Sequence, residues 1–302
     1  MKGPKAEAGV VLAITAAASF GISGPLLKPM IDAGWSPSAL VIVRSLISAL
    51  VLLVPGLYAA RGRWSQTWHA RYDIAMVGLI GVAASQLAFA QSLKTLPVGT
   101  AILIQYSAPV VIVLYRWIAG RAAPSASTMV ASCLTLCGLF AVASPNIDNR
   151  LDLIGVLWAT AAMVTVALYY VTASRVPHTV PAISAVVGSQ IIGAAALLML
   201  GFAGIIDTTI TTTSPVLQGQ HIPWWLPITT VGVIATALGF WASIAASRVL
   251  GSQKAAFFGT LEVAVAVTVA WLALAETPTA AQIIGGVFIT AGVATMRTRY
   301  ER

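Results

Sequence analysis

Long apolar segments constrain the fold of this chain more than any other feature of its sequence. Ten of them reach the length of about 20 residues that a helix needs to cross a hydrocarbon core. They occupy residues 9–29, 37–60, 73–94, 97–119, 125–144, 153–174, 181–203, 224–247, 251–274 and 278–297. Charged side chains make up 9% of the chain, against about 25% in soluble proteins. Because the runs are continuous, and do not alternate as β-barrel strands do, we predict an all-α membrane protein with ten transmembrane helices.

Basic residues stand singly at the ends of these runs, although the formal net charge is +8. This distribution is typical of topology signals and does not indicate nucleic-acid binding. One set of loops carries Lys2, Lys5, Arg61, Arg63, Arg71, Arg121, Arg175, Arg248, Lys254, Arg297, Arg299 and Arg302, and the opposite set carries Lys28, Lys94 and Arg150. The positive-inside rule therefore predicts that both termini are cytoplasmic and that the 204–223 loop, which lacks Lys and Arg, faces outward.

The two halves of the sequence repeat each other. A shift of 154 residues lays GLIGVAASQLAFAQSLKTL, which begins at Gly78, on GVIATALGFWASIAASRVL, which begins at Gly232. The same shift pairs Trp117 with Trp271, Pro124 with Pro278 and Gly138 with Gly292, and a shift of 146 pairs Gly9 with Gly155. Chance similarity between apolar segments is the alternative, but Trp, Pro and Gly match less easily than Ala, Leu or Val. We predict two repeats, at residues 1–150 and 151–302.

Five helices per repeat is an odd number, so the second repeat is expected to enter the membrane upside down. Lys94, expected outside, then corresponds to Arg248, expected inside. Inverted repeats are the architecture of alternating-access transporters, which hold the solute between the halves near the middle of the membrane. The sequence contains no G-x-x-x-x-G-K-[ST] motif. These features predict a secondary transporter with a central cavity, a small-molecule substrate and no use of ATP.

Several stretches resemble a known family. The first run passes through ASFGIS, and the last two read LEVAVAVTVAWLALAETPTAAQIIGGVFITAGV. Together with the duplication, they resemble EamA-type members of the drug/metabolite transporter superfamily, and most of all bacterial exporters of aromatic and other neutral amino acids. The resemblance covers nearly the whole chain. It implies an inner-membrane exporter in which the first, third, fourth, sixth, eighth and ninth helices surround the cavity, and the fifth and tenth are peripheral.

Members of this family often carry Glu-Pro in the ninth helix, with an echo in the fourth. Here the pair is split into Glu262-Val263 in one copy and Ala108-Pro109 in the other. The fourth helix has therefore kept the proline and lost the acid, which argues against a proton site there.

Polar residues and a proline interrupt the fourth run, LIQYSAPVVIVL. Gln105, Tyr106 and Ser107 cannot all face lipid, because three successive residues span most of the circumference of a helix. Pro109 removes a backbone donor and leaves a carbonyl near Gln105 without its usual partner. These groups either bind the solute, for instance its ammonium group, or hold two helices together.

Two charged residues lie within the runs. Glu262 is expected in a cavity, as a proton carrier, a counter-charge for a substrate ammonium group, or a structural acceptor. Arg44 lies about two turns from the outer end of its helix. We expect its side chain to snorkel to the interface, with attraction of a carboxylate as the alternative.

Neutral polar and aromatic side chains complete the expected cavity. Gln86 gives the third helix a polar face, and Trp158, Tyr169, Trp241 and Phe257 lie well within their runs. Aromatic walls with a few neutral polar groups suit a zwitterion with an apolar side chain, although core packing is the alternative for each ring. Flexible hinges are expected at Gly24, Pro25 and Pro109, with one fixed curved shape as the alternative.

The sequence gives little support for disulfides, metal sites, cofactors or catalysis. Cys133 and Cys137 lie four residues apart in one run and are expected to pack on the same helix face, with no disulfide and no metal. One deep acid and no deep histidine do not support an intramembrane enzyme, and no cofactor is expected. The alternatives to amino-acid export are exchange of phosphorylated sugars or nucleotide sugars, which would need several cavity Arg or Lys, and broad export of drugs or cations. Lipid is the expected surroundings, and the oligomeric state is left open.

Overall fold

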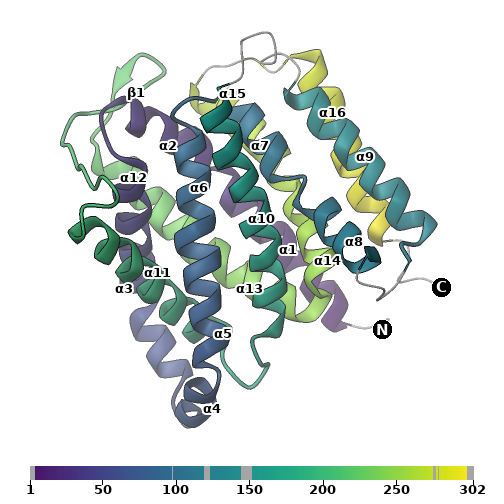
Figure 1. The fold of residues 1–302 in the computed structure, drawn as a ribbon, viewed down its shortest axis with the longest axis horizontal. Coiled ribbons are helices and arrows are strands. Elements are labelled where there is room, and N and C mark those ends of the chain that lie inside the picture. The colour runs from purple at the N-terminus through teal and green to yellow at the C-terminus, as the bar shows by residue number, and fades with distance from the viewer. Residues whose placement is uncertain are drawn as a thin grey trace.

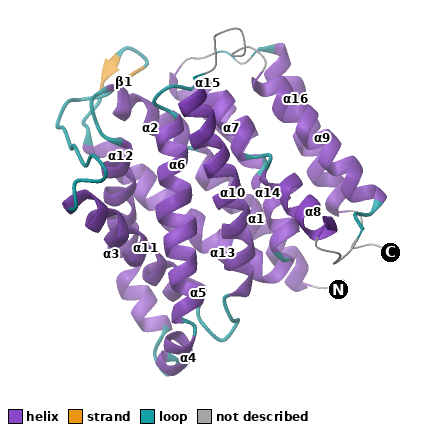
Figure 2. Cartoon of the chain, in the orientation of Figure 1, coloured by secondary structure: helices purple, strands orange, loops and turns teal. Residues whose placement is uncertain are grey.

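The protein is a bundle of helices with one short hairpin (Figures 1 and 2). The structure, a computed structural model, describes residues 4–96, 98–118, 123–143, 152–274, 277 and 279–297. Six helical stretches are long and apolar enough by themselves to cross a membrane: Glu7–Asp32, Pro37–Ala59, Arg71–Ser92, Leu153–Arg175, Ala182–Phe202 and Trp225–Leu250. They coincide with six of the ten runs that the sequence indicates.

The elements follow one another in two similar series. The first is α1 (Pro4–Gly21), α2 (Ser23–Asp32), α3 (Pro37–Ala59), α4 (Trp64–His69), α5 (Arg71–Met76), η1 (Val77–Ala84), α6 (Ser85–Ser92), α7 (Val98–Gln105), α8 (Ala108–Ile118) and α9 (Ala126–Ala143). The second is α10 (Leu153–Arg175), α11 (Ala182–Phe202), β1 (Val216–Leu217), β2 (Gln220–His221), α12 (Trp225–Thr230), η3 (Val231–Leu238), α13 (Gly239–Leu250), α14 (Ser252–Gly259), α15 (Leu261–Leu274) and α16 (Ala280–Arg297).

Three of the predicted runs are broken helices, where the sequence pattern predicts continuous ones. The first run breaks at Ile22, between α1 and α2, because Pro25 cannot donate to the carbonyl four residues earlier. The fourth breaks at Tyr106 and Ser107, just before Pro109. The ninth breaks at Thr260, whose hydroxyl donates to the Phe257 carbonyl at 2.6 Å. A side-chain hydroxyl that competes for helix carbonyls in this way loosens a helix without any proline.

The boundaries of the elements repeat at the same shift of 154 residues as the sequence. The π-helical segments η1 and η3 match residue for residue, as do both ends of α9 and α16. The break at Tyr106 in the first series corresponds to the break at Thr260 in the second. Because π-helical turns are rare, their recurrence at one shift is strong structural support for a duplication.

Contacts between the two series are reciprocal. Helix α1 packs against α13, and its counterpart α10 packs against α6, the counterpart of α13. Likewise η1 packs against α11, and η3 packs against α3. At the closest approaches, Gly9 faces Val249 and Leu250, whereas Gly155 faces Thr95 and Leu96. Each series therefore uses the same surface to bind the other, as expected for two halves related by an approximate two-fold axis.

Helices at equivalent positions lie against each other in opposite directions. In the pair α9 and α16, Gly138 approaches Gly285 and Ile289, while Gly292 approaches Thr135 and Ala131. Residue numbers rise in one helix as they fall in the other, so the pair is antiparallel (Figure 1). In the pair α3 and α11, Gly56 contacts Val187, and residues from the first turns of α3 pack near Leu197.

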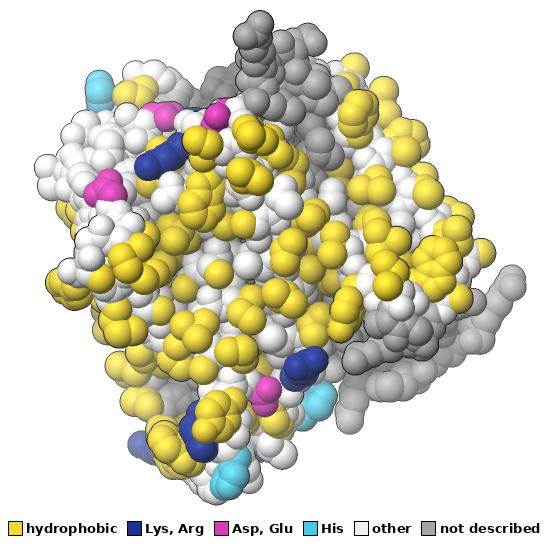
Figure 3. All heavy atoms as spheres, in the orientation of Figure 1, with side chains coloured by type: hydrophobic (Ala, Val, Ile, Leu, Met, Phe, Trp, Pro, Cys, Tyr) yellow, Lys and Arg dark blue, Asp and Glu magenta, His cyan; other side chains and the backbone are white. Residues whose placement is uncertain are grey.

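The outward face of α9 carries the two cysteines, so the prediction that Cys133 and Cys137 are packing residues is wrong. Both side chains are exposed, because the opposite face of the helix, with Ala131, Thr135 and Gly138, is the one that contacts α16. Trp117 and its counterpart Trp271 also lie on the outer surface. Figure 3 shows hydrophobic side chains covering the middle of one face, with charged side chains and histidines near its two ends.

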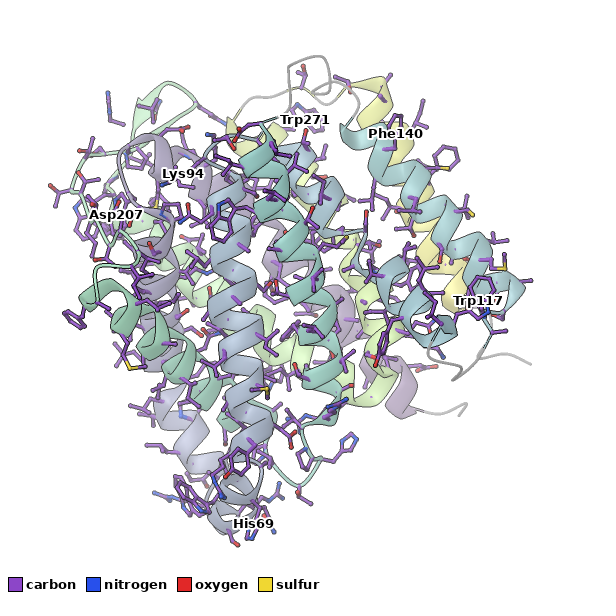
Figure 4. The ribbon with its side chains drawn as sticks, in the orientation of Figure 1. His69, Lys94, Trp117, Phe140, Asp207 and Trp271 are labelled. Atoms are coloured by element: carbon purple, nitrogen blue, oxygen red, sulfur yellow. The ribbon has the colours of Figure 1, made fainter. Side chains whose placement is uncertain are left out.

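The long segment 203–224 forms a cover at one end of the bundle. It contains the β1–β2 hairpin, and its Thr209 carbonyl accepts from the backbone N–H of Ser36 at 3.0 Å. The Asp207 carbonyl accepts from the Ser38 hydroxyl. In the same segment, hydrogen bonds from Thr209 lower the pKa of the Asp207 carboxyl below its ordinary value. The segment is thereby fastened to the beginning of α3, at the end of the bundle opposite His69 (Figure 4).

The close approach at Gly138 generates a stability prediction. A methyl group added there would lie 2.6 Å from the Gly285 carbonyl oxygen, so Gly138→Ala forces α9 and α16 apart. We expect a destabilisation of about 1–3 kcal/mol, as for other overpacked sites, measured by thermal unfolding in detergent. Gly286→Ala is the matched control, because no atom lies within 4 Å of the added methyl group. Equal effects of the two changes would contradict the close packing of α9 on α16.

Candidate solute site between the two halves

A small cavity with both polar and apolar lining residues lies in the interior of the bundle, between the two series of helices. Its volume is about 30 Å³, enough for one or two water molecules and far below the roughly 300 Å³ at which ligand pockets begin. It is lined by Phe20, Ser23, Arg44, Gly81, Ser85, Gln86, Phe89, Gln105, Tyr106, Val166, Tyr169, Tyr170, Phe240 and Glu262. Both halves contribute, so any movement of one half against the other changes the cavity.

Aromatic rings form one side of the cavity. Phe240 of α13 stands edge-on to Phe20 of α1 at 5.3 Å and to Tyr169 of α10 at 5.5 Å between ring centroids. Tyr169 also contacts Tyr170 at 5.2 Å, and its hydroxyl donates to Ser243 at 2.9 Å. Edge-to-face contacts of this kind are favourable beyond the area they bury. The rings therefore make an ordered apolar wall from three helices.

The two equivalent helix breaks meet at the opposite part of the cavity. Glu262 is the second residue of α15, directly after the break at Thr260, and it is half-buried. Its carboxylate accepts a hydrogen bond from the hydroxyl of Tyr106, which lies in the break between α7 and α8. A helix N-terminus and a donated hydroxyl both stabilise a carboxylate. The duplication thus brings an acid from one half onto a polar turn of the other.

Arg44 supplies a second charge from α3. Its side chain is 1% exposed, and its Nε donates to Thr236 Oγ1 at 2.8 Å while Nη1 donates to Ser23 Oγ at 3.0 Å. The prediction that Arg44 snorkels to the interface is therefore wrong. The two hydroxyls, from η3 and α2, hold the guanidinium inside the bundle, where it shares the cavity with Glu262.

Five of the predicted cavity residues line this cavity: Gln86, Gln105, Tyr106, Tyr169 and Glu262. The other four lie elsewhere. Trp158 is 38% exposed on the outer surface, Ser107 is half-buried beside the helix break, and Phe257 is buried in a cluster with Val113 and Ala131. Trp241 is not among the lining residues; it is half-buried and packs against the core cluster that includes Phe240.

The predicted hinge positions lie close to breaks. Gly24 and Pro25 are both buried in the first turn of α2, just after the break at Ile22. Pro109 is the second residue of α8 and is also buried. The structure shows the helix breaks, and bending at them belongs to the proposed transport mechanism.

Several residues that line the cavity were not among the residues predicted from the sequence. Ser85 precedes Gln86 in α6. Phe240 is the residue of the second repeat that corresponds to Gln86 at the shift of 154 residues. Phe20, Ser23, Phe89 and Val166 carry no signal in the sequence, because small and apolar residues fill every helix of this chain. Among the described residues, no group of three His, Cys, Asp or Glu side chains is placed to hold a metal ion.

The sequence matches the EamA-like transporter family over residues 7–144 and again over 153–298. The chain belongs to this family. The two matches correspond to the two series of elements, so the prediction of a two-repeat membrane transporter is confirmed. Among individually curated proteins, no sequence relative of the chain is found.

A solved structure titled "Crystal structure of protein" has the same fold. It superposes with a TM-score of 0.71 over 98% of this chain and 99% of the other, at 19% sequence identity. At that identity the likeness extends to the fold alone.

The contact that holds Arg44 inside the bundle generates a second stability prediction. Thr236→Val keeps the shape of the side chain and removes the acceptor of Arg44 Nε, and it also removes the donor to the Val231 carbonyl. We expect a loss of roughly 1–3 kcal/mol in thermal unfolding, because a buried charged donor is left without its partner.

Thr229→Val is the matched control for Thr236→Val. The Thr229 hydroxyl bonds to carbonyls of its own helix, those of Trp225 and Leu226, and has no role in the cavity. Its substitution is expected to change the melting temperature little. Should both variants unfold at the same temperature as the unchanged protein, Thr236 does not hold Arg44 in place.

Proposed function

We propose that this chain is a secondary transporter that exports neutral amino acids, aromatic ones included, or similar small metabolites across a bacterial inner membrane. The observation that supports the proposal is the small internal cavity, which polar and apolar side chains of both repeats line. Such a site between two halves is what alternating access requires, because the halves can expose it to one compartment and then to the other.

Ten membrane crossings in two inverted sets follow from the same proposal. The antiparallel pairing of α9 with α16 and of α3 with α11 supports inversion, because equivalent helices then cross in opposite directions. The broken runs α7–α8 and α14–α15, with α9 and α16, account for the four crossings beyond the six long ones. Both termini are then cytoplasmic, as the distribution of basic residues predicts.

A change of shape is required for transport. A cavity of about 30 Å³ cannot enclose an amino acid, so the structure is a closed conformation of the site. The breaks beside Pro25, Pro109 and Thr260 interrupt the three helices whose ends reach the cavity. Bending at these positions would open the site without unfolding a whole helix.

The lining residues favour a neutral solute with an apolar part. The amides of Gln86 and Gln105 supply neutral hydrogen bonds, Glu262 attracts an ammonium group, and the rings of Phe240 and Tyr169 contact an apolar side chain. Phosphorylated sugars would need several cations around one site. Arg44 is the one Lys or Arg among the described residues that line the cavity.

The test is exchange of radiolabelled solutes in proteoliposomes that contain the purified protein. We expect labelled phenylalanine to exchange with internal unlabelled phenylalanine faster than in empty liposomes, whereas sugar phosphates and tetraphenylphosphonium do not. Exchange of a sugar phosphate or the lipophilic cation, without amino-acid exchange, would contradict the proposed substrate class.

Glu262→Gln tests the role of the cavity-lining acid in the same assay. Loss of the counter-charge is expected to reduce amino-acid exchange at least tenfold, or about 1.4 kcal/mol or more. Glu7→Gln, the same change at an exposed position of α1, is expected to leave exchange unchanged. If both variants transport like the unchanged protein, Glu262 takes no part in solute binding.

A further inference from the structure

We propose that Arg44 is the carboxylate-binding residue of the solute site, and that the transported solutes are therefore zwitterions held between Arg44 and Glu262. The inference rests on the transport function proposed above and narrows it. It assigns opposite ends of the solute to opposite charges, and it makes Arg44 a residue that determines specificity.

The guanidinium of Arg44 has donors that the protein does not use. Two of its five N–H groups are occupied by the hydroxyls of Thr236 and Ser23. Its Nη2 atom is fully buried and has no hydrogen-bond partner among the described residues. An unpaired charged donor in a bilayer-embedded interior is costly. The free edge, Nη2 with the remaining hydrogen of Nη1, matches the fork that a carboxylate takes.

The partners of Arg44 orient the side chain without neutralising it. The Thr236 hydroxyl donates to the Val231 carbonyl, five residues earlier, at 2.9 Å. This is the spacing of the π-helical segment η3, and it leaves a lone pair of Thr236 directed at Arg44 Nε at 2.8 Å. Ser23, in the first turn of α2, fixes Nη1 in the same way. Neutral hydroxyl groups therefore position the guanidinium, and they do not neutralise its positive charge.

Glu262 does not supply that anion by direct contact. The two side chains line the same cavity and attract each other through space. In the part of the chain that the structure describes, however, the salt bridge within 4.0 Å is Lys28 to Asp32, outside the cavity. The two charges therefore line the same cavity at a separation of more than 4.0 Å. Glu262 keeps carboxylate lone pairs beyond the one that Tyr106 occupies.

This arrangement selects for zwitterions by charge. An α-amino acid places its carboxylate on Arg44 and its ammonium on Glu262, so both charges are paired. A simple amine leaves Arg44 unpaired, and a simple carboxylic acid leaves Glu262 unpaired. Since unpaired buried charges are penalised strongly, the site discriminates against both classes. The rings of Phe20, Phe240 and Tyr169 are then left for the side chain of the solute.

The first part of the test uses the unchanged protein. Unlabelled phenylalanine, phenethylamine and 3-phenylpropionate compete against exchange of labelled phenylalanine in proteoliposomes. We expect the amine and the acid to compete about 30-fold or more weakly than phenylalanine, because each leaves one buried charge unpaired. Equal competition by the amine would overturn the role of Arg44 while amino-acid transport still stood. Absence of any amino-acid exchange would instead contradict the proposed transport function.

The second part assigns the carboxylate to Arg44. Thermal stabilisation in detergent reports binding of phenylalanine and of phenethylamine to Arg44→Gln, Arg44→Lys and the control Arg248→Gln. Arg248 is half-buried and donates to the carbonyls of Pro177 and Val180, away from the cavity. We expect Arg44→Gln to weaken phenylalanine binding about 30-fold and to leave phenethylamine binding unchanged. Arg44→Lys is expected to restore part of the phenylalanine binding, and Arg248→Gln to alter neither.

Outcomes of the second part separate binding from a purely structural role. If Arg44→Gln weakens the two ligands equally, or neither, the proposal is overturned. If Arg44→Gln does not fold, the decision passes to Arg44→Lys, which keeps the charge and loses the planar fork. In that variant the ratio of phenylalanine to phenethylamine affinity must fall, and an unchanged ratio would overturn the assignment.

Discussion

The antiparallel pairing of equivalent helices is the constraint on which the rest of the structure depends. In a bilayer there is no hydrophobic force between helices, so close packing of small residues has to hold them together. Gly138 and Gly292 allow α9 and α16 to approach, and Gly9 and Gly155 do the same for α1 and α10 against their partners. Because each half uses the same surfaces, the polar centre of the molecule is shared by both. The cavity exists where the two halves meet.

The duplication also explains why charge can be kept inside. A break in α7–α8 and the equivalent break in α14–α15 each expose polar backbone and side-chain groups to the centre, where Tyr106 meets Glu262. The two π-helical segments flank the same region: η1 contributes Gly81 to the lining, and η3 contributes Thr236, which holds Arg44. Features that weaken individual helices thus recur symmetrically around one site. Repetition of the same series of elements in both halves places them there.

Arg44 and Glu262 give the centre its chemical character. Direct pairing of the two charges would leave a neutral, closed core. Two hydroxyls hold the guanidinium and a third hydroxyl binds the carboxylate, and the two charges line the same cavity without direct contact. A solute with matching charges completes the arrangement. Movement of the halves then changes the distance between the charges, because Arg44 belongs to the first repeat and Glu262 to the second. The proposed transport cycle would couple binding to opening for this reason.

Much of the architecture could be predicted from the length of the hydrophobic runs and from the repeated positions of Trp, Pro and Gly. They predicted the helical class, the two repeats, and a polar interruption at Gln105 and Tyr106. Helix facing was harder to predict. The sequence pattern predicts that Cys133 and Cys137 pack against a neighbouring helix, but both are exposed. It predicts that Arg44 reaches the interface, but Arg44 is buried. The direction in which a helix face points depends on which neighbouring helix it meets. The break at Thr260 lacks a proline to mark it. Trp158 shows the same difficulty, since most of the runs are apolar all round.

Sidedness of the two loops that follow α3 and α11 tests inversion of the repeats most directly. Gln66 lies after α3 and Thr208 after α11, both exposed and at opposite ends of the bundle, near the labelled His69 and Asp207 (Figure 4). Single cysteines at these positions, with Cys133 and Cys137 replaced by Ser, are treated with an impermeant maleimide on one side of sealed vesicles. The account predicts that only one of the two cysteines reacts from each side. Reaction of both from the same side would contradict it.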